Sequence, residues 1–401
     1  MPVVSALAPL PQADLEHVLA HTEAVWREMA GASIFITGGT GFFGRWLLET
    51  LAWANARLQV GICATLLSRD PATHAHRSPR LAANRSMAVV GGDVRSFDFP
   101  EGRFTHVVHA AFDSSRPIGD PLAAFDTLVA GTRRVLEFAA TQPLQKMLFV
   151  SSGAVYGPQP PGMACMPEDY RGGPDPASAS SVYGEGKRAA ELLCALAAAN
   201  GLPVAIARCF AFIGPGLPLD AHFAAGNFLR DAAAGREIVI KGDGRLLRSY
   251  LYAADLAIWL WTVLLRGDAG RAYNIGSEQA ISIGELARQI AACAAAPGVT
   301  VLGKPGGGAA ERYVPDTARA RSELGLAQYI DLPEAIRRVR SILQQQDKNE
   351  RAFVDLLLLT REAGLDALET ACELVLESGV VNANVLQNAV RRLIEPIRPK
   401  T

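Results

Sequence analysis

Residues 33–44 read SIFITGGTGFFG, and this stretch determines the fold class expected of the chain. Residues 33–37 are a short apolar run typical of a buried strand, and Gly38, Gly41 and Gly44 follow at three-residue intervals. In a strand–turn–helix unit the first glycine permits the tight turn, the second lets the backbone approach a pyrophosphate, and the third lets helix and strand pack closely. A helix expected at 45–54 presents N–H groups and a positive dipole end to the phosphates. The stretch therefore predicts a dinucleotide site, although the spacing alone also fits an ordinary glycine turn.

The sequence around this unit alternates between strand and helix patterns. Short apolar runs predict strands at 60–67, 88–91, 106–110, 147–150 and 203–207, and apolar residues at helical spacing predict helices at 121–140 and 181–199. Strands that alternate with helices of this length pair in parallel through right-handed crossovers. Residues 31–213 are therefore expected to form a Rossmann-type, doubly wound α/β domain with a parallel sheet.

Other segments precede and follow this domain. Residues 12–30 have a helical apolar face that ends at Gly31, which predicts an N-terminal helical extension over 1–30. Residues 214–343 have a looser pattern and are expected to form a smaller α/β region, mainly for substrate binding, with a flexible loop at 304–310. A polar linker is expected at 344–349, and a helical appendage at 350–401 with helices at 353–360, 365–377 and 384–396.

The composition argues against several classes of protein. The chain has 401 residues, and its 39 Lys and Arg nearly balance its 40 Asp and Glu, so it lacks the positive charge expected of a nucleic-acid-binding protein. Its longest apolar run, 256–265, is about half as long as a membrane span requires. The six cysteines have no paired spacing, which predicts no metal site and favours free thiols in a reducing, cytoplasmic compartment.

A second motif, Tyr183-Gly-Glu-Gly-Lys187, lies where the helix at 181–199 is expected to begin. Four residues are about one helical turn, so both side chains project from one face. A free tyrosine is a poor base at neutral pH because its pKa is near 10, and a neighbouring ammonium is expected to lower that pKa. The motif predicts that Tyr183 acts as an acid or base and that Lys187 also holds ribose hydroxyls. The structural alternative is a surface tyrosine with a lysine one turn later.

Two serines follow the strand predicted at 147–150. They lie at the carboxyl edge of the sheet, where open α/β sheets bind their ligands. A hydroxyl at this edge is able to hold a substrate oxygen beside Tyr183. Of the two, Ser152 is preferred over Ser151 for this role.

Two other strand ends provide candidate cofactor contacts. Asp93 in GGDV follows the strand at 88–91, where its carboxylate is able to accept a hydrogen bond from an adenine amino group. Ala110 and Ala111 lie at the end of the strand at 106–110, where small side chains let the backbone lie against a cofactor. Core packing explains the alanines equally well.

Taken in order, the motifs GGTGFFG, GGDV, HAA, SSGAVYG, YGEGK and GDGRLLRSYLYAADLA resemble the extended short-chain dehydrogenase/reductase family, in its nucleotide-sugar epimerase/dehydratase branch. The resemblance covers residues 31–343 and implies an enzyme that uses NAD or NADP on a nucleotide sugar. It also implies a homodimer formed through the helices at 121–140 and 181–199. Catalytic roles are implied for Ser152, Tyr183 and Lys187, and substrate contacts for Ser152, Asn227, Arg248 and Arg312. Cofactor contacts are implied for Gly38, Thr40, Gly41, Phe42, Phe43, Gly44, Arg69, Asp93, Val94, Ala110, Ala111, Tyr183, Lys187 and Phe210.

The sequence departs from this family's pattern at four positions. Family members that dehydrate a sugar carry Asp-Glu directly after the catalytic hydroxyl, and UDP-glucuronate decarboxylases carry the Glu. Gly153 and Ala154 stand there in this chain, which disfavours both reactions. The Asn of N-V-x-G-T is Leu128 and the Asn of R-Y-F-N is Ala211, so the proton relay and the diphosphate contacts are expected to differ.

The expected chemistry is hydride transfer at C4 of a nucleotide-linked hexose, with Tyr183 as the acid/base. Arg69 after the second strand favours NADP because an arginine accommodates the 2'-phosphate, whereas Asp70 keeps NAD open. A redox-neutral epimerase and an NADPH-dependent reductase of an NDP-4-keto-6-deoxyhexose use the same three residues, and both stay open, with NADP favouring the reductase. A cofactor-sensing binding protein without turnover is the alternative from a different class.

The end of the chain has a different character. Residues 356–393, LLLLTREAGLDALETACELVLESGVVNANVLQNAVRRL, resemble the extreme C-terminus of an insertion-sequence transposase subunit. This resemblance implies a reading-frame fusion that carries no transposase activity. The alternative is a helical appendage that docks on the main domain.

Overall fold

The computed structural model of the chain describes residues 6–115, 117–221, 223–304, 306, 308–377 and 383–394. The chain forms two compact units, residues 1–337 and residues 338–401. The first unit contains every residue that the sequence identifies as a candidate for binding or catalysis.

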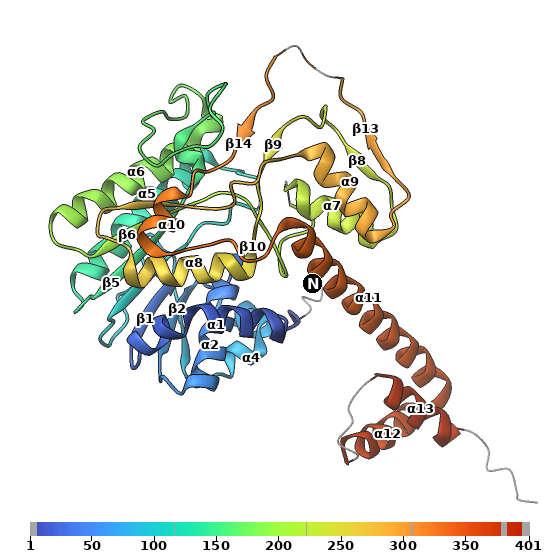
Figure 1. Cartoon of the computed structure of the whole chain (residues 1–401). Helices are drawn as coiled ribbons and strands as arrows, with labels where there is room; N and C mark the ends of the chain where they lie inside the picture. The colour runs from blue at the N-terminus through green and yellow to red at the C-terminus, as the bar shows by residue number, and fades with distance from the viewer. Residues whose placement is uncertain are drawn as a thin grey trace, which may run out of the picture. The chain divides into compact units, whose positions relative to one another are not determined.

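A seven-stranded sheet forms the centre of the first unit (Figure 1), and its strand order is β11-β6-β5-β4-β1-β2-β3. Every neighbouring pair is parallel; for example, Ile34 of β1 pairs with Ala64 of β2 on one side and with His106 of β4 on the other. The chain therefore winds outward from β1 in both directions, which confirms the expected doubly wound parallel sheet. The strands are β1 Ser33–Thr37, β2 Cys63–Ser68, β3 Met87–Gly91, β4 His106–His109, β5 Lys146–Ser152, β6 Val204–Cys209 and β11 Ala272–Ile275.

Helices cover both faces of this sheet. The crossover from β1 to β2 and the crossovers from β4 to β6 run in opposite directions along the sheet, so their right-handed helices lie on opposite faces. The first face carries α2 (Phe42–Leu58), which packs with α8 (Ala253–Arg266), and the second carries α5 (Pro121–Ala140) packed with α6 (Val182–Ala199). Two short helices, α3 (Pro71–Arg77) and α4 (Pro79–Ala82), lie between β2 and β3.

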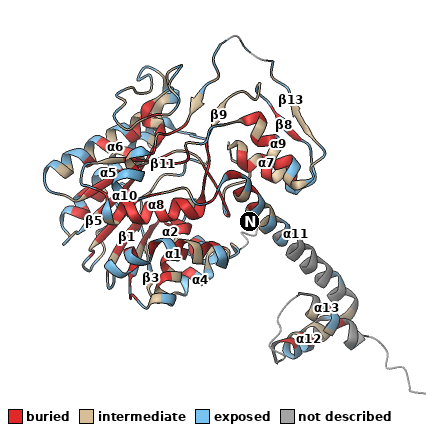
Figure 2. Ribbon diagram, in the orientation of Figure 1, coloured by how far each residue is buried: buried red, intermediate tan, exposed pale blue. Residues whose placement is uncertain are grey.

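The core lies between the sheet and these helices (Figure 2). Phe35 of β1 is fully buried, and its ring centroid lies 5.5 Å from that of Phe97 and 4.7 Å from that of Phe138 in α5. Burying such large aromatic side chains supplies much of the apolar area that stabilises a domain of this size.

The N-terminal helix α1 (Gln12–Glu28) lies within the segment expected as a helical extension. It packs across α2 and α8, with Trp26 fully buried and its ring centroid 4.7 Å from that of Trp261. The hydroxyl of Tyr252 also donates to Asp14 Oδ2 at 2.6 Å. The extension is therefore a third layer on one face of the sheet, held by both apolar and polar contacts.

The segment after residue 213 forms small sheets and helices and then returns to the main layers. Its helices α7 (Ala224–Ala233) and α9 (Ile283–Ala294) pack together against the pair β8 (Ile238–Ile240) and β13 (Val299–Val301). A three-stranded sheet joins β12 (Ile281–Ser282), β9 (Leu247–Arg248) and β14 (Arg312–Tyr313). A short strand of this segment, β10 (Leu251–Tyr252), pairs in parallel with β7 (Phe212–Ile213), and the helix α10 (Ala318–Leu324) follows β14. Since α8 and β11 come from this same segment, it completes the central sheet as well as the smaller region.

The C-terminal region is helical, but the expected linker at 344–349 is wrong. These residues continue α11, a single helix over Leu332–Ala363 that also contains the helix expected at 353–360. The segment QQQDKN contains no Gly or Pro, and Gln and Lys are good helix formers, so its polarity does not break the helix. The next helices are α12 (Leu365–Glu377) and α13 (Ala383–Ile394), and the expected stop at Pro396 lies outside the described residues. In the expected loop at 304–310, the described residues form neither helix nor strand, and residues 305 and 307 lie outside the description.

No helix in the described part of the chain is long and apolar enough to cross a membrane. All six cysteines are free, as expected. The described residues also contain no cluster of three or more His, Cys, Asp or Glu side chains placed to hold a metal ion.

Candidate functional site

The glycine turn after β1 has the geometry that its spacing predicts. Gly38 has a φ of +75°, and a Cβ built on it would lie 2.2 Å from the carbonyl oxygen of Ala110. A Cβ on Gly44 would lie 2.4 Å from the carbonyl oxygen of Gly38. Both positions therefore exclude any side chain, the first because of its left-handed backbone and both because neighbouring backbone atoms are too close.

The turn leads directly into the N-terminus of α2. Gly41 is the N-cap residue, and among the residues that the structure describes no side chain caps this terminus. A Cβ on Gly41 would meet nothing closer than 3.5 Å, so the backbone there is open to a ligand. Thr40 beside it is exposed, and Phe42 and Phe43 are half-buried. An uncapped helix terminus with an open glycine backbone is suited to a pyrophosphate.

Two carboxylates near this terminus already have partners. Asp70 is the N-cap of α3, and its carboxylate accepts from Thr73 N at 2.9 Å and from Thr73 Oγ1 at 2.6 Å. Asp93 accepts from Arg95 Nε at 2.7 Å, and this guanidinium holds the pKa of Asp93 below its usual range. Arg69 is exposed and lies close enough to contribute to the same lowering of the pKa of Asp93.

A buried histidine at the end of β4 hydrogen-bonds to β1 on one side and to α5 on the other. His109 Nδ1 lies 2.7 Å from Thr37 Oγ1, and its Nε2 lies 3.0 Å from Thr132 Oγ1 on α5. Burial, with a smaller effect of the Lys187 ammonium, lowers the pKa of His109 to about 3. His109 is therefore neutral at physiological pH and fixes the position of the following residues, Ala110 and Ala111.

Lys187 lies beneath the candidate catalytic hydroxyls. Its side chain is buried, Nζ donates to the carbonyl oxygen of Val150 at 2.7 Å, and Nζ lies 4.9 Å from the ring centroid of Phe149. Burial lowers the pKa of Lys187 to about 8. The ammonium is thus held against β5.

Tyr183 faces Ser152 on β5 and Ser114 in the loop after β4. Its ring centroid lies 5.3 Å from that of Phe112. Burial raises the pKa of Tyr183 to about 12, while hydrogen bonds with the two serines oppose the rise. The expected lowering of this pKa by Lys187 is therefore wrong for this structure, because burial dominates and the ammonium of Lys187 is directed to Val150.

The two adjacent serines point to different partners. Ser151 Oγ donates to Glu191 Oε1 at 2.5 Å, and Glu191 also accepts from Arg208 Nη2 at 2.7 Å. Ser152 Oγ accepts from Ala154 N at 3.1 Å and faces Tyr183. Ser151 therefore belongs to a buried polar network, and Ser152 belongs to the candidate site.

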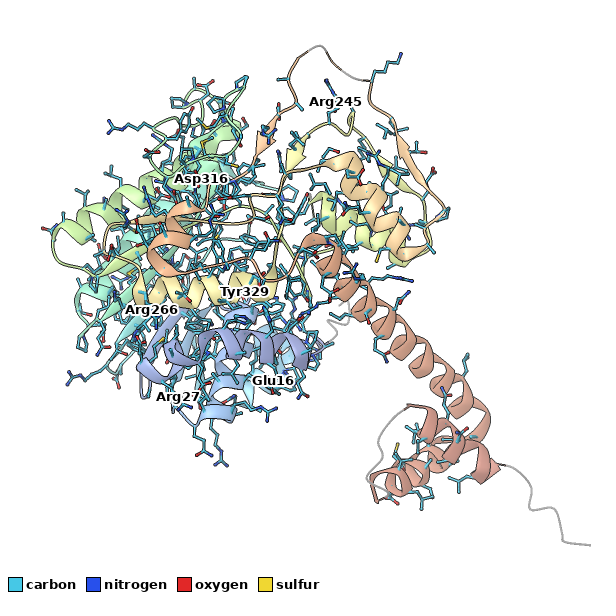
Figure 3. All side chains as sticks on the ribbon, viewed as in Figure 1. Glu16, Arg27, Arg245, Arg266, Asp316 and Tyr329 are labelled. Atoms are coloured by element: carbon cyan, nitrogen blue, oxygen red, sulfur yellow. The ribbon has the colours of Figure 1, made fainter. Side chains whose placement is uncertain are left out.

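Tyr313 on β14 is a site residue that the sequence reasoning missed. Its hydroxyl interacts with Ser152, and its electrostatic interaction with Tyr183 is among the causes that raise its own pKa. Its ring centroid lies 4.6 Å from that of Phe210, the residue directly after β6. The segment is found in Figure 3 by the labelled Asp316, which follows β14. The segment ERYVPD contains the signal, because Tyr313 directly follows Arg312, which the sequence identifies as a candidate substrate contact.

The structure brings one of the three expected substrate-binding residues on the smaller region into this cluster. The guanidinium of Arg248 lies 5.3 Å from the ring centroid of Tyr313, and burial lowers the pKa of Arg248. Arg312 precedes Tyr313 in the strand, and its positive charge interacts with the Cys165 thiol. Its Nε is buried with no hydrogen-bond partner in the described structure. Asn227 Nδ2 donates to the carbonyl oxygen of Ala221 at 2.9 Å. Roles for Asn227 and Arg312 stay predictions.

The site therefore combines two kinds of surface. One is a glycine turn and an open helix terminus suited to phosphates, and the other is a group of hydroxyls, from Ser152, Tyr183 and Tyr313, with the Lys187 ammonium below. The hydroxyls are able to donate or accept protons, and no carboxylate follows Ser152, since residues 153 and 154 are Gly and Ala.

The sequence is also similar to those of known proteins. The sequence matches the NAD dependent epimerase/dehydratase family over residues 34–276, which include Ser152, Tyr183 and Lys187. It is 30% identical over 315 residues to a dTDP-glucose 4,6-dehydratase of Streptomyces griseus, covering 76% of this chain and 91% of that protein. It is 26% identical over 324 residues to UDP-glucuronic acid decarboxylase 1 of Xenopus tropicalis, covering 79% of this chain and 74% of that protein.

The fold is also similar to a solved structure. UDP-glucose 4-epimerase of Thermotoga maritima superposes with a TM-score of 0.67 at 22% identity, covering 78% of this chain and 99% of that one. This likeness shows that the two proteins share a fold.

Proposed function

The chain belongs to the NAD dependent epimerase/dehydratase family, the extended short-chain dehydrogenase/reductases of nucleotide sugars, and on that premise we propose that it acts at C4 of a nucleotide-linked hexose with Tyr183 as the acid/base. The observation that carries the proposal is the position of the Tyr183 hydroxyl, which faces Ser152 at the carboxyl edge of the sheet. In such a site Ser152 holds the substrate oxygen and Tyr183 exchanges a proton with it.

The residues at the glycine turn fit a dinucleotide. When bound, NAD or NADP supplies the group that accepts and returns hydride. Gly38 and Gly44 exclude side chains where the backbone must pass closely, and the open backbone of Gly41 presents N–H groups to the pyrophosphate. Ala110 and Ala111 form the wall beside Gly38, and Val94 and Phe210 complete the set of proposed contacts.

The cofactor we favour is NADP. Asp70 uses its carboxylate to cap α3, which reduces its availability to a ribose hydroxyl, whereas Arg69 beside it is exposed. An exposed arginine at this strand end suits a 2'-phosphate. NAD stays the second candidate, because the Arg69 guanidinium also interacts with the Asp93 carboxylate.

The reaction we favour is either reduction of an NDP-4-keto-6-deoxyhexose or redox-neutral epimerisation at C4. The relatives named above as a dehydratase and a decarboxylase suggest other reactions on nucleotide sugars. Against both stands the absence of a carboxylate at positions 153 and 154, where the space beside Gly153 is taken by the Tyr313 hydroxyl. NADP favours the reductase.

The decisive experiment mixes the purified protein with NADPH or NADH and a panel of UDP-, dTDP-, GDP- and CDP-linked hexoses and 4-keto-6-deoxyhexoses. Stoichiometric loss of the absorbance of reduced nicotinamide with a keto sugar identifies a reductase, and sugar interconversion without net change identifies an epimerase. The control is Tyr183→Phe, which should lose turnover and keep cofactor binding. If no sugar is turned over by the wild type, the proposal fails in favour of a cofactor-sensing binding protein.

We also propose that two copies associate through α5 and α6. These helices pack together and leave large apolar side chains in solvent: Leu122 is 79% exposed, Leu192 is 62% exposed and Leu196 is 55% exposed. Apolar side chains grouped on neighbouring helices are typical of a subunit interface.

A further inference from the structure

The hydroxyl of Tyr313 occupies space that the sequence leaves free beside the candidate catalytic serine. A Cβ built on Gly153 would lie 2.6 Å from Tyr313 Oη and 2.8 Å from Phe210 Cζ. Such short contacts force one of the groups to move, so any residue other than glycine at 153 displaces the Tyr313 ring. Gly153 and Tyr313, which lie far apart in the sequence, are therefore structurally coupled.

Ser152 interacts with two tyrosine hydroxyls at once. It lies close enough to the hydroxyls of Tyr183 and Tyr313 to interact with both. A serine hydroxyl has one proton to donate and two lone pairs that accept, and Ser152 already accepts from Ala154 N at 3.1 Å. It is therefore able to donate to one tyrosine while it accepts from the other.

The charges around the two tyrosines differ. Tyr313 faces the Arg248 guanidinium on β9, together with Cys209 at the end of β6, and burial raises its pKa above the usual range. Tyr183 faces Ser114 in the loop after β4 as well as Cys209, with the buried Lys187 one helical turn further along α6. Burial raises the pKa of both tyrosines, so both are protonated, and Tyr183 is the one proposed to exchange its proton with the substrate, which leaves Tyr313 as the constant donor of the pair.

We propose that Tyr313 is a positioning residue that donates to Ser152 and thereby directs the single Ser152 proton to Tyr183, an arrangement for which Gly153 leaves the room. Three hydroxyls form a chain from Tyr313 through Ser152 to Tyr183. When Tyr183 gives its proton to a substrate oxygen, the resulting phenolate accepts the Ser152 hydrogen bond, which the Tyr313 donor strengthens through polarisation along the chain. No proton leaves Tyr313 in this step. The catalytic consequence rests on the proposed role of Tyr183, but the chain itself does not.

The test replaces Tyr183 with 3,5-difluorotyrosine, whose phenol titrates at lower pH than tyrosine, and follows its ionisation by fluorine NMR in the full-length protein. Two backgrounds are compared, the otherwise unchanged chain and Tyr313→Phe. The chain predicts that loss of the Tyr313 hydroxyl moves the ionisation of residue 183 upward by about 0.5 to 1 pH unit. An unchanged or lower ionisation pH in the Tyr313→Phe background overturns the proposal.

Two further variants keep the result interpretable. Gly153→Ala retains the Tyr313 hydroxyl but displaces it, and it should produce an upward shift like that of Tyr313→Phe. Tyr329→Phe removes a tyrosine hydroxyl from a side chain that is 46% exposed and whose ring packs against His17 and His21 of α1, and it should produce no shift. If Tyr313→Phe were to unfold, which circular dichroism detects, Gly153→Ala alone decides.

The result is separate from that of the activity assay. A protein that turns over no nucleotide sugar but shows the upward shift retains the hydroxyl chain and loses the proposed function. A protein that turns over a sugar without the shift retains the function and excludes the positioning role of Tyr313.

Discussion

Lys187 Nζ lies 2.7 Å from the carbonyl oxygen of Val150, which lies on the strand that ends in Ser152. The contact fixes α6 to β5 and holds the Tyr183 turn of the helix over the strand end. It also holds an ammonium where burial lowers its pKa from 10.5 to about 8. The buried ammonium is therefore both a structural tie and a source of pH dependence.

The pH dependence has a definite sign. Between pH 8 and 10.5 the unfolded lysine binds more protons than the folded one, so the free energy of unfolding rises with pH across this window. The slope approaches about 1.4 kcal/mol per pH unit within this window and falls to zero below pH 8, where both states are protonated and the cost of burying the ammonium is largest.

Urea unfolding of the wild type and Lys187→Met at several pH values measures this contribution. The wild type should gain stability relative to the variant as pH rises from 8 towards 10. Lys241→Met, which removes an exposed lysine, is the control. Parallel pH profiles for the wild type and Lys187→Met would show that Lys187 titrates as an ordinary lysine.

The serines at the end of β5 allow structure and activity to be separated. Ser151→Ala removes the 2.5 Å hydrogen bond to buried Glu191 and should lower the free energy of unfolding by about 1 to 2 kcal/mol while turnover persists. Ser152→Ala removes the hydrogen bond from Ala154 N at 3.1 Å and should lower the free energy of unfolding by a similar amount, but it should also reduce turnover about 100-fold or more. Chemical denaturation and the nucleotide-sugar assay measure the two effects. The reverse pattern would assign the catalytic hydroxyl to Ser151.

The glycines of the turn provide a second matched pair. Gly38→Ala places a methyl group 2.2 Å from the Ala110 carbonyl oxygen on a backbone with a φ of +75°, and should destabilise the fold by about 2 kcal/mol or more. Gly41→Ala adds a methyl group where the nearest atom is 3.5 Å away, so the fold should persist. That methyl group lies in the proposed path of the pyrophosphate and should weaken dinucleotide binding about tenfold. Scanning calorimetry measures the effect on stability, and titration calorimetry measures the effect on dinucleotide binding. If Gly41→Ala binds the dinucleotide as tightly as the wild type, the phosphates do not lie against Gly41.

Much of this architecture is predictable from the sequence because its signals are local. The helix expected at 121–140 is α5, whose start is set by Pro121 and by the Asp120 side chain, which accepts from Leu122 N at 3.0 Å. The glycine turn has a similarly local cause in the spacing of its residues.

The parts that failed depend on long-range contacts or on burial. Tyr313 reaches Ser152 only because β14 pairs with β9, a relationship that no local pattern records. The pKa of Tyr183 depends on how deeply the hydroxyl is buried and on where the Lys187 ammonium points, and neither follows from a four-residue spacing. The segment 344–349 is polar yet helical, because its residue types favour a helix and composition was a weak guide there.

Cofactor choice is testable at the end of β2. Arg69→Ala should raise the Kd for NADPH about tenfold and change the Kd for NADH less than about twofold, because only NADPH carries the 2'-phosphate. Asp70→Ala removes the cap of α3 and should lower stability without changing the preference between the two cofactors. Fluorescence titrations of each variant give the affinities. Equal losses for NADPH and NADH in Arg69→Ala would remove the basis for favouring NADP.

The exposed leucines of α5 and α6 make the proposed association testable. A glutamate at Leu192 or Leu196 places a charge in a face that must lose water on dimerisation, and such a charge is costly to bury without a partner. Each variant should therefore raise the dimer dissociation constant by about 100-fold, measured by sedimentation equilibrium. Leu302→Glu changes a side chain that is 63% exposed outside these helices, and should leave association unchanged. If all three variants sediment like the wild type, the face formed by α5 and α6 is not where two copies meet, and the apolar exposure there has another cause.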